Sequence, residues 1–469
     1  MDSNINSIGQ LEEELEKKFT GCADFISRKL ALGNAAGLIC CIREMADKNY
    51  IADKIIRPLF AKGDFKDFNG NFDGVLQTTA ITRGDNIDDI CCALCTGGAL
   101  VAVDNGCLHA VICPADSYFG RSAGKSDTDI TVRGPQTSFV DDIDKNVSSL
   151  RKIIRSPSLK IESFKKGNIT NTRIALLFIE GRAESTLIDA ARRKLNEISA
   201  SVIVDSGNIE SLIQNNRYGF FPSFGVTEKV DKAASLLASG RVVIICDGSP
   251  FIITAPYVFM ESLQSAEDYL RSPYYATFSR LLRFASLLAA LFLPALFLIL
   301  VNEHPELLPT ELTDIITEQR EGIPFTLFIE VMLMLIVFEM LREVGVRMPR
   351  PVGNAVGLVG SIIIGDAATK AGVASTTVIL IVAISAVANF IVPAYMNTTS
   401  ILRLVFLTAA WLAGFAGLIF VSGTALCALC AKENLNTPYM SSITPFKASS
   451  MLDFIIAVPQ KTLGRKEKP

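Results

Sequence analysis

The spacing of apolar residues divides the chain into two unlike halves, with the boundary near Arg283. Before this residue, short apolar runs alternate with charges and glycines, as in a globular protein. From Phe284 to Ala431 the chain consists mostly of long apolar stretches. Because a membrane helix needs roughly 20 apolar residues, the pattern predicts a soluble N-terminal half of α+β or α/β class, followed by an all-α polytopic transmembrane bundle.

The first segment of the soluble half has helical periodicity. In residues 11–60, Leu, Ile and Ala recur at helical spacing with charges between them. Pro58 and the glycines from Gly63 to Gly74 then interrupt the pattern. Since proline and glycine end helices, we expect a helical leader over residues 1–70 that closes in a loop.

Two β-rich segments of the soluble half share one pattern. In Gly98–Cys113, two apolar runs are joined by Asp104-Asn-Gly106, a composition that suits the positive φ angles of a tight turn. About 140 residues later, Ser239–Pro256 repeats the pattern around Asp247-Gly248. We therefore expect two hairpins in two related α/β subdomains, residues 71–165 and 166–275.

The second subdomain contains a further pattern before its hairpin. Thr172–Phe178 predicts a strand, Glu184–Ile198 an amphipathic helix, and Ala200–Val204 another strand. Their order predicts a βαβ unit.

One segment imitates a phosphate-binding loop. Gly120–Ser126 ends in Gly-Lys-Ser, but Phe119 stands where the motif needs a glycine. Asp127 and Asp129 are also a poor opening for a helix that should hold phosphates at its N-terminus. We expect no nucleotide there, and no other cofactor.

The histidines and a run of carboxylates are expected to have structural rather than catalytic roles. His109 alternates with apolar neighbours in a strand, and the other histidine, His304, lies beyond the membrane boundary. No histidine-based catalytic pair follows. Asp141, Asp142 and Asp144 predict the start of a helix, where negative charge is favourable.

The eleven cysteines show no disulfide-framework spacing, so we expect reduced thiols. Cys92-Ala-Leu-Cys95 with Cys107 and Cys113 is the alternative, a zinc site. Because that region is largely apolar and the last two cysteines fall in a strand pattern, we expect no metal. Cys427-Ala-Leu-Cys430 lies at the end of an apolar stretch and indicates packing.

The second half of the chain predicts a transmembrane domain over residues 276–431 and a tail over residues 432–469. Five apolar stretches follow one another: Phe284–Val301, Ile323–Leu341, Val352–Gly372, Ser375–Val392 and Leu404–Cys427. The first, fourth and fifth carry no charge and are the clearest spans.

The second stretch contains Glu330 and Glu339. A glutamate among lipid chains is costly, so at least one of them must face protein or water. Glu339 is followed by Arg342 and Glu343, which favours an ion-pair cluster at the membrane surface. Glu330 is the better candidate for a buried site.

The third stretch is rich in small residues and carries charges near its end. Such a segment serves either as a close helix contact or as a pore wall or re-entrant segment. Together with the two glutamates, it supplies the remaining candidate residues of an ion pathway or gate: Gly353, Gly357, Gly360, Ser361, Gly365 and Asp366.

The distribution of charge predicts the orientation. Arg271, Arg280 and Arg283 precede the first span, whereas residues 302–322 contain six acids and one arginine. The N-terminal half is therefore expected inside. Five full spans would place the basic tail outside, so we expect one stretch, the third, to cross incompletely.

The composition excludes one class of partner. With a net charge of −3 and 20% charged residues, the chain has no basic footprint for nucleic acid. Residues 1–20 are polar and lack the apolar core of a signal peptide, so we expect the first half not to be exported.

Several separated motifs along the chain occur together in one known family. In the first half they are Arg133-Gly134-Pro135, Leu150-Arg151, Asp205-Ser-Gly207, Phe221-Pro222, Thr227-Glu228, Gly240-Arg241, Asp247-Gly248-Ser-Pro250 and Glu267-Asp268-Tyr269. In the second half they are Glu303-His304, Gly322-Ile-Pro324-Phe325, Glu330, Phe338-Glu339, Leu341-Arg342-Glu343, Arg347-Met-Pro349, Gly360, Gly365 and Ala371-Gly372. With these motifs the chain resembles the A subunit of the GerA-type nutrient germinant receptors of bacterial endospores, and it is also similar to stage V sporulation protein AF.

The resemblance implies a non-enzymatic subunit of a receptor in the spore inner membrane, with its N-terminal half on the cytoplasmic side. The implied partners are a transporter-like B subunit, a lipoprotein C subunit, further copies of the chain, and membrane lipid. The family's A subunit resembles an oligomeric, nutrient-gated ion channel. A secondary transporter and a signalling scaffold without a pore stay open as alternatives.

Overall fold

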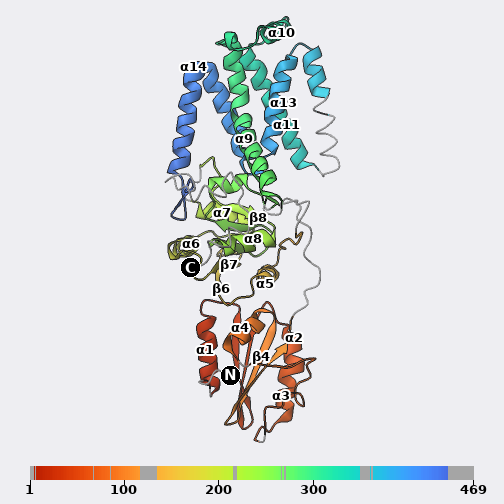
Figure 1. Cartoon of the computed structure of the whole chain (residues 1–469), viewed down its shortest axis with the longest axis vertical. Coiled ribbons are helices and arrows are strands. Elements are labelled where there is room, and N and C mark those ends of the chain that lie inside the picture. The colour runs from red at the N-terminus through yellow and green to blue at the C-terminus, as the bar shows by residue number, and fades with distance from the viewer. Residues whose placement is uncertain are drawn as a thin grey trace. The chain divides into compact units, whose positions relative to one another are not determined.

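The computed structural model describes residues 5, 7–66, 68–84, 86–116, 135–214, 219–265, 267–268, 271–348, 360 and 363–441 (Figure 1). The chain divides into two compact units. The first consists of Met1–Arg217, Ser223–Tyr257 and Asn434–Thr437, and the second of Tyr218–Pro222, Val258–Glu433 and Pro438–Pro469.

The first unit begins with a five-stranded antiparallel sheet in the order β1-β2-β4-β5-β3. Its strands are β1 (Phe25–Leu32), β2 (Ala35–Ile42), β3 (Thr82–Arg83), β4 (Gly98–Asp104) and β5 (Leu108–Pro114). The helices around it are α1 (Ile8–Lys18), α2 (Lys48–Tyr50), the π-helix η1 (Ile51–Ile56), α3 (Arg57–Lys62) and α4 (Ile87–Cys95).

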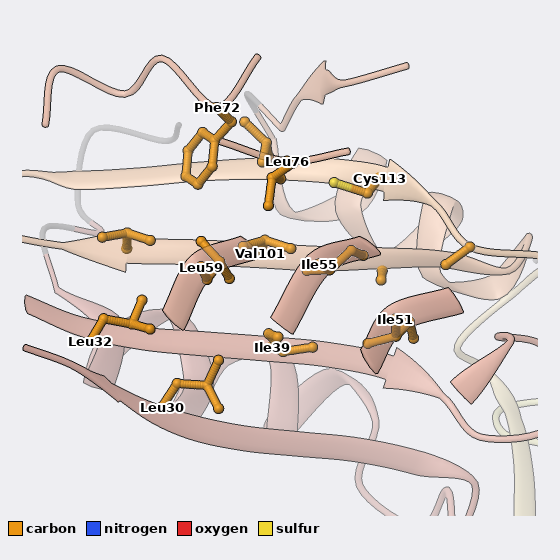
Figure 2. Packing of buried hydrophobic residues seen from close by; sticks show 14 of the residues in the cluster. Leu30, Leu32, Ile39, Ile51, Ile55, Leu59, Phe72, Leu76, Val101 and Cys113 are labelled. Carbon is orange, nitrogen blue, oxygen red and sulfur yellow. The ribbon is translucent and has the colours of Figure 1, made fainter. Parts of the chain in front are cut away.

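Both faces of this sheet are covered. On one face, Ile51 and Ile55 of η1 and Leu59 of α3 pack over Ile39 and Val101 (Figure 2). On the other face, α1 and α4 supply a second core. Because the central strands are buried on both sides, they are continuously apolar rather than alternating.

A second five-stranded sheet follows in the same unit, in the order β6-β7-β9-β10-β8. Its strands are β6 (Leu159–Lys166), β7 (Thr172–Ile179), β8 (Gly225–Thr227), β9 (Val242–Cys246) and β10 (Ile252–Ala255). Helices α5 (Ile143–Ile153) and α8 (Val230–Ala238) cover one face, and α6 (Ser185–Glu197) and α7 (Ser206–Ile213) cover the other.

The two sheets are repeats of one topology. In each, a helix precedes a pair of strands, and the last two strands form a hairpin that the short third strand flanks. The predicted hairpins are confirmed as β4–β5 and β9–β10. The relation between the two β-rich segments is thus a property of the whole α/β repeat.

The predicted helical leader is wrong over residues 25–42, which form the hairpin β1–β2. Gly33 makes the turn with a φ of +60°, where a side chain would be strained. Strand β2 is buried on both faces, and a short apolar run of that kind cannot be told from a buried helix by periodicity.

Two other boundaries differ from the prediction. Strand β6, expected in the first subdomain, pairs with β7 in the second sheet, so the second repeat begins with α5. The predicted strand Ala200–Val204 is not a strand, and Val202 and Val204 are exposed. The βαβ unit is therefore wrong, because the neighbours of β7 are antiparallel.

A buried ion pair joins the two repeats. The Nε and Nη2 atoms of Arg151 in α5 donate to the two carboxylate oxygens of Asp24, before β1, at 2.9 and 3.0 Å. The side chains are 0% and 2% exposed. Backbone hydrogen bonds between Ile161 of β6 and the loop at Gly21 and Ala23 add to this junction.

Glu44, after β2, is a second buried acid near this junction. The residue is 9% exposed, and one of its carboxylate oxygens has no hydrogen-bond partner among the described residues. Burial, and then the negative charge of Asp24, raise the pKa of Glu44 to about 7. The folded repeat therefore favours the protonated carboxyl.

This raised pKa predicts a dependence of stability on pH. Between the ordinary pKa of 4.5 and about 7, the folded state binds the extra proton, so stability falls as pH rises through this window. Over this window the free energy of unfolding falls by up to about 3 kcal/mol. Hydrogen exchange of the β2 amides at pH 5 and 8, corrected for intrinsic rates, measures it. Glu44→Gln is expected to remove most of the dependence, and Glu13→Gln, at an exposed position of α1, to keep it.

The second unit is built of helices. They are the 3-10 helix η2 (Phe259–Leu263), α9 (Pro273–Asn302), η4 (Pro305–Leu307), α10 (Thr310–Arg320), α11 (Leu327–Arg347), α13 (Thr376–Phe390), η5 (Pro393–Tyr395) and α14 (Met396–Ala431). Residues 363–370 are also helical, and two-residue strands β11 (Glu433–Asn434) and β12 (Thr437–Pro438) follow α14.

Two helical segments in the described part of the chain are long and apolar enough to cross a membrane, namely Pro273–Asn302 and Pro393–Ala431. Helix α13 is apolar but shorter, and α11 carries several charges. The first, second, fourth and fifth predicted stretches thus lie mostly in helices, and the full polytopic bundle stays a prediction.

Helix α14 reverses its direction in the middle. Ala413 and Gly414 have non-helical backbone angles, and Gly414 has a φ of +53° and a ψ of −137°. A Cβ at Gly417 would overlap the carbonyl of Ala409, although eight residues of a straight helix span about 12 Å. Residues 396–412 and 415–431 therefore form two halves folded against each other (Figure 1).

Candidate functional site

Glu330 lies in the first turn of α11, whose N-terminus is capped by the hydroxyl of Thr326. Its side chain is completely buried. One carboxylate oxygen accepts hydrogen bonds from the backbone N–H and the hydroxyl of Ser375, both at 2.6 Å. Ser375 is the N-cap of α13, so the carboxylate lies at the positive end of that helix.

The other oxygen of Glu330 lies 3.5 Å from the Nε atom of Arg320, at the end of α10. Glu330 therefore joins α10, α11 and α13 at one point. Such a carboxylate is expensive among apolar helices, and the arginine and the helix N-terminus offset part of that cost.

Glu339 lies nine residues further along α11 in a separate network. Its carboxylate pairs with Arg403 of α14, which is fully buried, and with Arg342 at 2.8 Å. Arg342 also donates to the hydroxyl of Ser400 at 2.7 Å. Asn389, at the end of α13, accepts a hydrogen bond from Thr399. The network thus ties α11, α13 and α14 together.

The predicted ion pair of Glu339 with Arg342 is confirmed, whereas Glu343 pairs with Arg347 on the exposed side. Glu339 is 20% exposed, so it is less buried than Glu330, as expected. The two glutamates do not meet: each belongs to its own network. Their role in an ion pathway stays a prediction.

The small-residue candidates are only partly within the described chain. Gly353, Gly357 and Ser361 lie outside the described residues. A Cβ at Gly360 would lie 3.0 Å from Leu341 of α11, which makes this glycine a close helix contact. A Cβ at Gly365 has only ordinary contact, and Asp366 pairs with Lys370 at 2.7 Å on an exposed face.

The sequence analysis did not predict the roles of three residues: Arg403, Ser375 and Glu303. Arg403 lies one residue before the predicted fifth stretch, so it was not recognised as a charge within an apolar helix. Ser375 is the first residue of the predicted fourth stretch, but its role as the N-cap of a helix was not predicted. Glu303 lies against Gly414 at the α14 reversal, and neither residue has a local pattern that indicates this contact.

The candidates of the first unit have structural roles. The ring of His109 packs edge-on against Phe68, as expected of a structural histidine. Asp142 caps α5 by accepting from the N–H of Asp144 at 2.9 Å, which confirms the predicted helix start. The segment Gly120–Ser126 lies outside the described residues.

All eleven cysteines are free, as predicted, and burial raises the pKa of the Cys95 and Cys113 thiols to about 12 and about 11. Within the described ranges, no group of three or more His, Cys, Asp or Glu side chains could hold a metal.

The fold and these networks define a class of protein: a repeated α/β unit joined to a helical unit with long apolar helices and buried charges. The Bacillus/Clostridium GerA spore germination protein family matches residues 13–468, and this chain belongs to that family. The family is one of spore germination proteins rather than of enzymes.

Individual relatives agree. The chain is 34% identical over 455 residues to spore germination protein KA of Bacillus subtilis, covering 95% of this chain and 83% of that protein. It is 36% identical over 359 residues to spore germination protein A1 of the same organism, covering 76% and 74%. It is 30% identical over 459 residues to the B. subtilis membrane protein YfkQ, covering 97% and 89%.

Among solved structures, the N-terminal domain of the A subunit of the Bacillus megaterium spore germinant receptor GerK3 is similar, with a TM-score of 0.40 and 24% identity, over 54% of this chain and 96% of that chain. The relatives as a group support a role for this chain in spore germination, and they support its assignment as a membrane protein.

Proposed function

We propose that this chain is the membrane subunit of a nutrient germinant receptor and acts as an oligomeric, nutrient-gated ion channel in the spore inner membrane. Its α/β half lies on the cytoplasmic side. Its partners are a transporter-like B subunit and a lipoprotein C subunit. The spore germination proteins among its relatives support the receptor part of this proposal.

One observation carries the channel part: Glu330 is a fully buried carboxylate in an apolar helical unit. Ionisable groups inside a membrane are costly, and they commonly mark ion pathways, proton relays or ligand sites. Glu330 contacts the ends of two other helices, through Arg320 and Ser375, so movement of either helix changes the surroundings of the charge.

The reversal of α14 bears on the side of the membrane at which the basic C-terminal tail lies. Glu303, after α9, lies at the reversal, so this turn is at the far end of α9. Thr398 and Lys432, at the two ends of α14, both bond to the segment 220–222. With both halves of α14 counted as passes, complete crossing by the third stretch gives an even number of passes, so the basic tail no longer requires an incomplete third stretch.

The test is flux through the purified chain reconstituted with its partners. Glu330→Gln keeps an acceptor for Ser375 but removes the charge, and we expect nutrient-triggered monovalent-cation flux to change by about tenfold or more. Glu343→Gln, on the exposed side of the same helix, is the matched control and should leave flux unchanged.

Absence of cation flux both with and without nutrient would contradict the channel proposal. Substrate counterflow in the same vesicles would indicate a secondary transporter instead. Normal germination of spores that carry Glu330→Gln or Gly360→Leu would indicate a scaffold without a pore.

A further inference from the structure

The helical unit contains a cavity of about 470 Å³ between α9 and the two halves of α14. Leu287 and Leu291 of α9, Leu402 of the first half, and Ala425 and Leu429 of the second half are among the residues that line it. None of the described lining residues is charged. A cavity of this size is large enough for a small ligand.

The polar groups of the cavity are already occupied. Its hydroxyls, those of Tyr395, Thr398, Thr399 and Ser422, all make hydrogen bonds within the protein. Ser422, for example, donates to the carbonyl of Leu418 at 2.6 Å. A ligand that needs hydrogen bonds, or a cluster of water molecules, therefore gains little here. The cavity is suited to an apolar occupant.

The mouth of the cavity lies on the outer surface. Leu288 of α9 and Leu426 of α14 line the cavity and are also exposed, at 40% and 56%. Helices α9 and α14 are the two that are long and apolar enough to cross a membrane. In a bilayer, an opening between them faces hydrocarbon.

We propose that this cavity binds one alkyl chain of a membrane lipid, which enters between α9 and the second half of α14. The inference rests on the membrane placement in the proposed function. An empty volume of this size deprives its walls of contacts, and a hydrocarbon chain restores them without any polar partner. The alkyl chain then contacts α9 and both halves of α14 at once.

The test uses the full chain in vesicles of phosphatidylglycerol and phosphatidylethanolamine that contain a phospholipid with a photoactivatable diazirine on its acyl chain. Labelling is mapped by mass spectrometry. We expect labelling at Leu287 and Leu291, and Ala425→Phe should lower it by roughly fivefold, because the ring occupies the space of the chain. Ala428→Phe, an exposed position of the same half that does not line the cavity, is the matched control and should keep it.

Equal labelling of Leu287 in the wild type and in Ala425→Phe would overturn the proposal, as would labelling no stronger than background. Leu291→Phe, from the opposite wall, should repeat the loss, which separates filling of the cavity from a folding defect. Ile419, exposed on α14, reports on the bilayer itself. Label on Ile419 without label on Leu287 contradicts the cavity alone, whereas an unlabelled Ile419 contradicts the membrane placement as well.

Discussion

Replacing Gly414 with alanine is expected to prevent the helical unit from folding. The backbone of Gly414, with a φ of +53° and a ψ of −137°, lies in a region that only glycine adopts easily. A Cβ there would also overlap the carboxylate of Glu303. The strain alone is on the order of 1–3 kcal/mol, and displacement of Glu303 adds to it. Because the two halves of α14 pack against each other, losing the reversal removes both from the core.

The measurement is the yield of monodisperse protein in detergent and its thermal unfolding. Gly423→Ala is the matched control, since Gly423 lies in the second half of α14 and a Cβ there meets nothing within 4 Å. Alanine favours a helix over glycine by about 1 kcal/mol, so this variant should be as stable as the wild type or slightly more stable. A Gly414→Ala protein with normal yield and unfolding temperature would contradict the assignment of the reversal.

Breaking the ion pair between Asp24 and Arg151 is expected to have the second large effect. Asp24→Ala leaves the guanidinium of Arg151 buried and unpaired, which costs about 3–5 kcal/mol. The Nη1 atom of Arg151 keeps its hydrogen bond to the carbonyl of Ser156 at 3.0 Å. Since the pair joins the two repeats, hydrogen exchange should increase in both β1 and α5, and proteolysis between the repeats should become faster.

A double-mutant cycle distinguishes this pair from an ordinary contact. Replacing both residues with apolar side chains of similar size, Asp24→Leu and Arg151→Met, should cost less than Asp24→Ala alone, because no charge is then left buried. The exposed pair Lys18–Asp88 is the control: Asp88→Ala should change stability by less than about 1 kcal/mol. Equal effects of Asp24→Ala and Asp88→Ala would contradict the role assigned to the junction.

Hairpins were the best predicted part of the fold. Asp104-Asn-Gly106 and Asp247-Gly248 are turn sequences, and Gly106 and Gly248 have φ angles of +104° and +86°. The hairpin β1–β2 was missed although its turn contains Gly33-Asn34, because helical spacing was assumed on both sides of it. Burial on both faces removed the alternation that identifies a strand.

The candidate site was predicted in part. Glu330 and Glu339 stood out because a carboxylate within an apolar stretch is a local departure from the pattern. Arg403 did not, because its importance comes from Glu339, which is 64 positions away in the chain. Likewise, nothing near Glu303 indicates Gly414.

The pattern of residues along the chain was enough to predict the division into an α/β half and an apolar helical half, the two related hairpins, and the acids among apolar residues. These are local properties, set by the length and period of apolar runs and by turn residues. Three features became clear from the folded chain alone: β1 and β2 complete the first sheet, α14 reverses, and the carboxylate of Glu330 accepts hydrogen bonds at the N-terminus of α13. Each of these depends on which distant segments pack together, and burial against a distant partner, rather than local propensity, then determines the conformation.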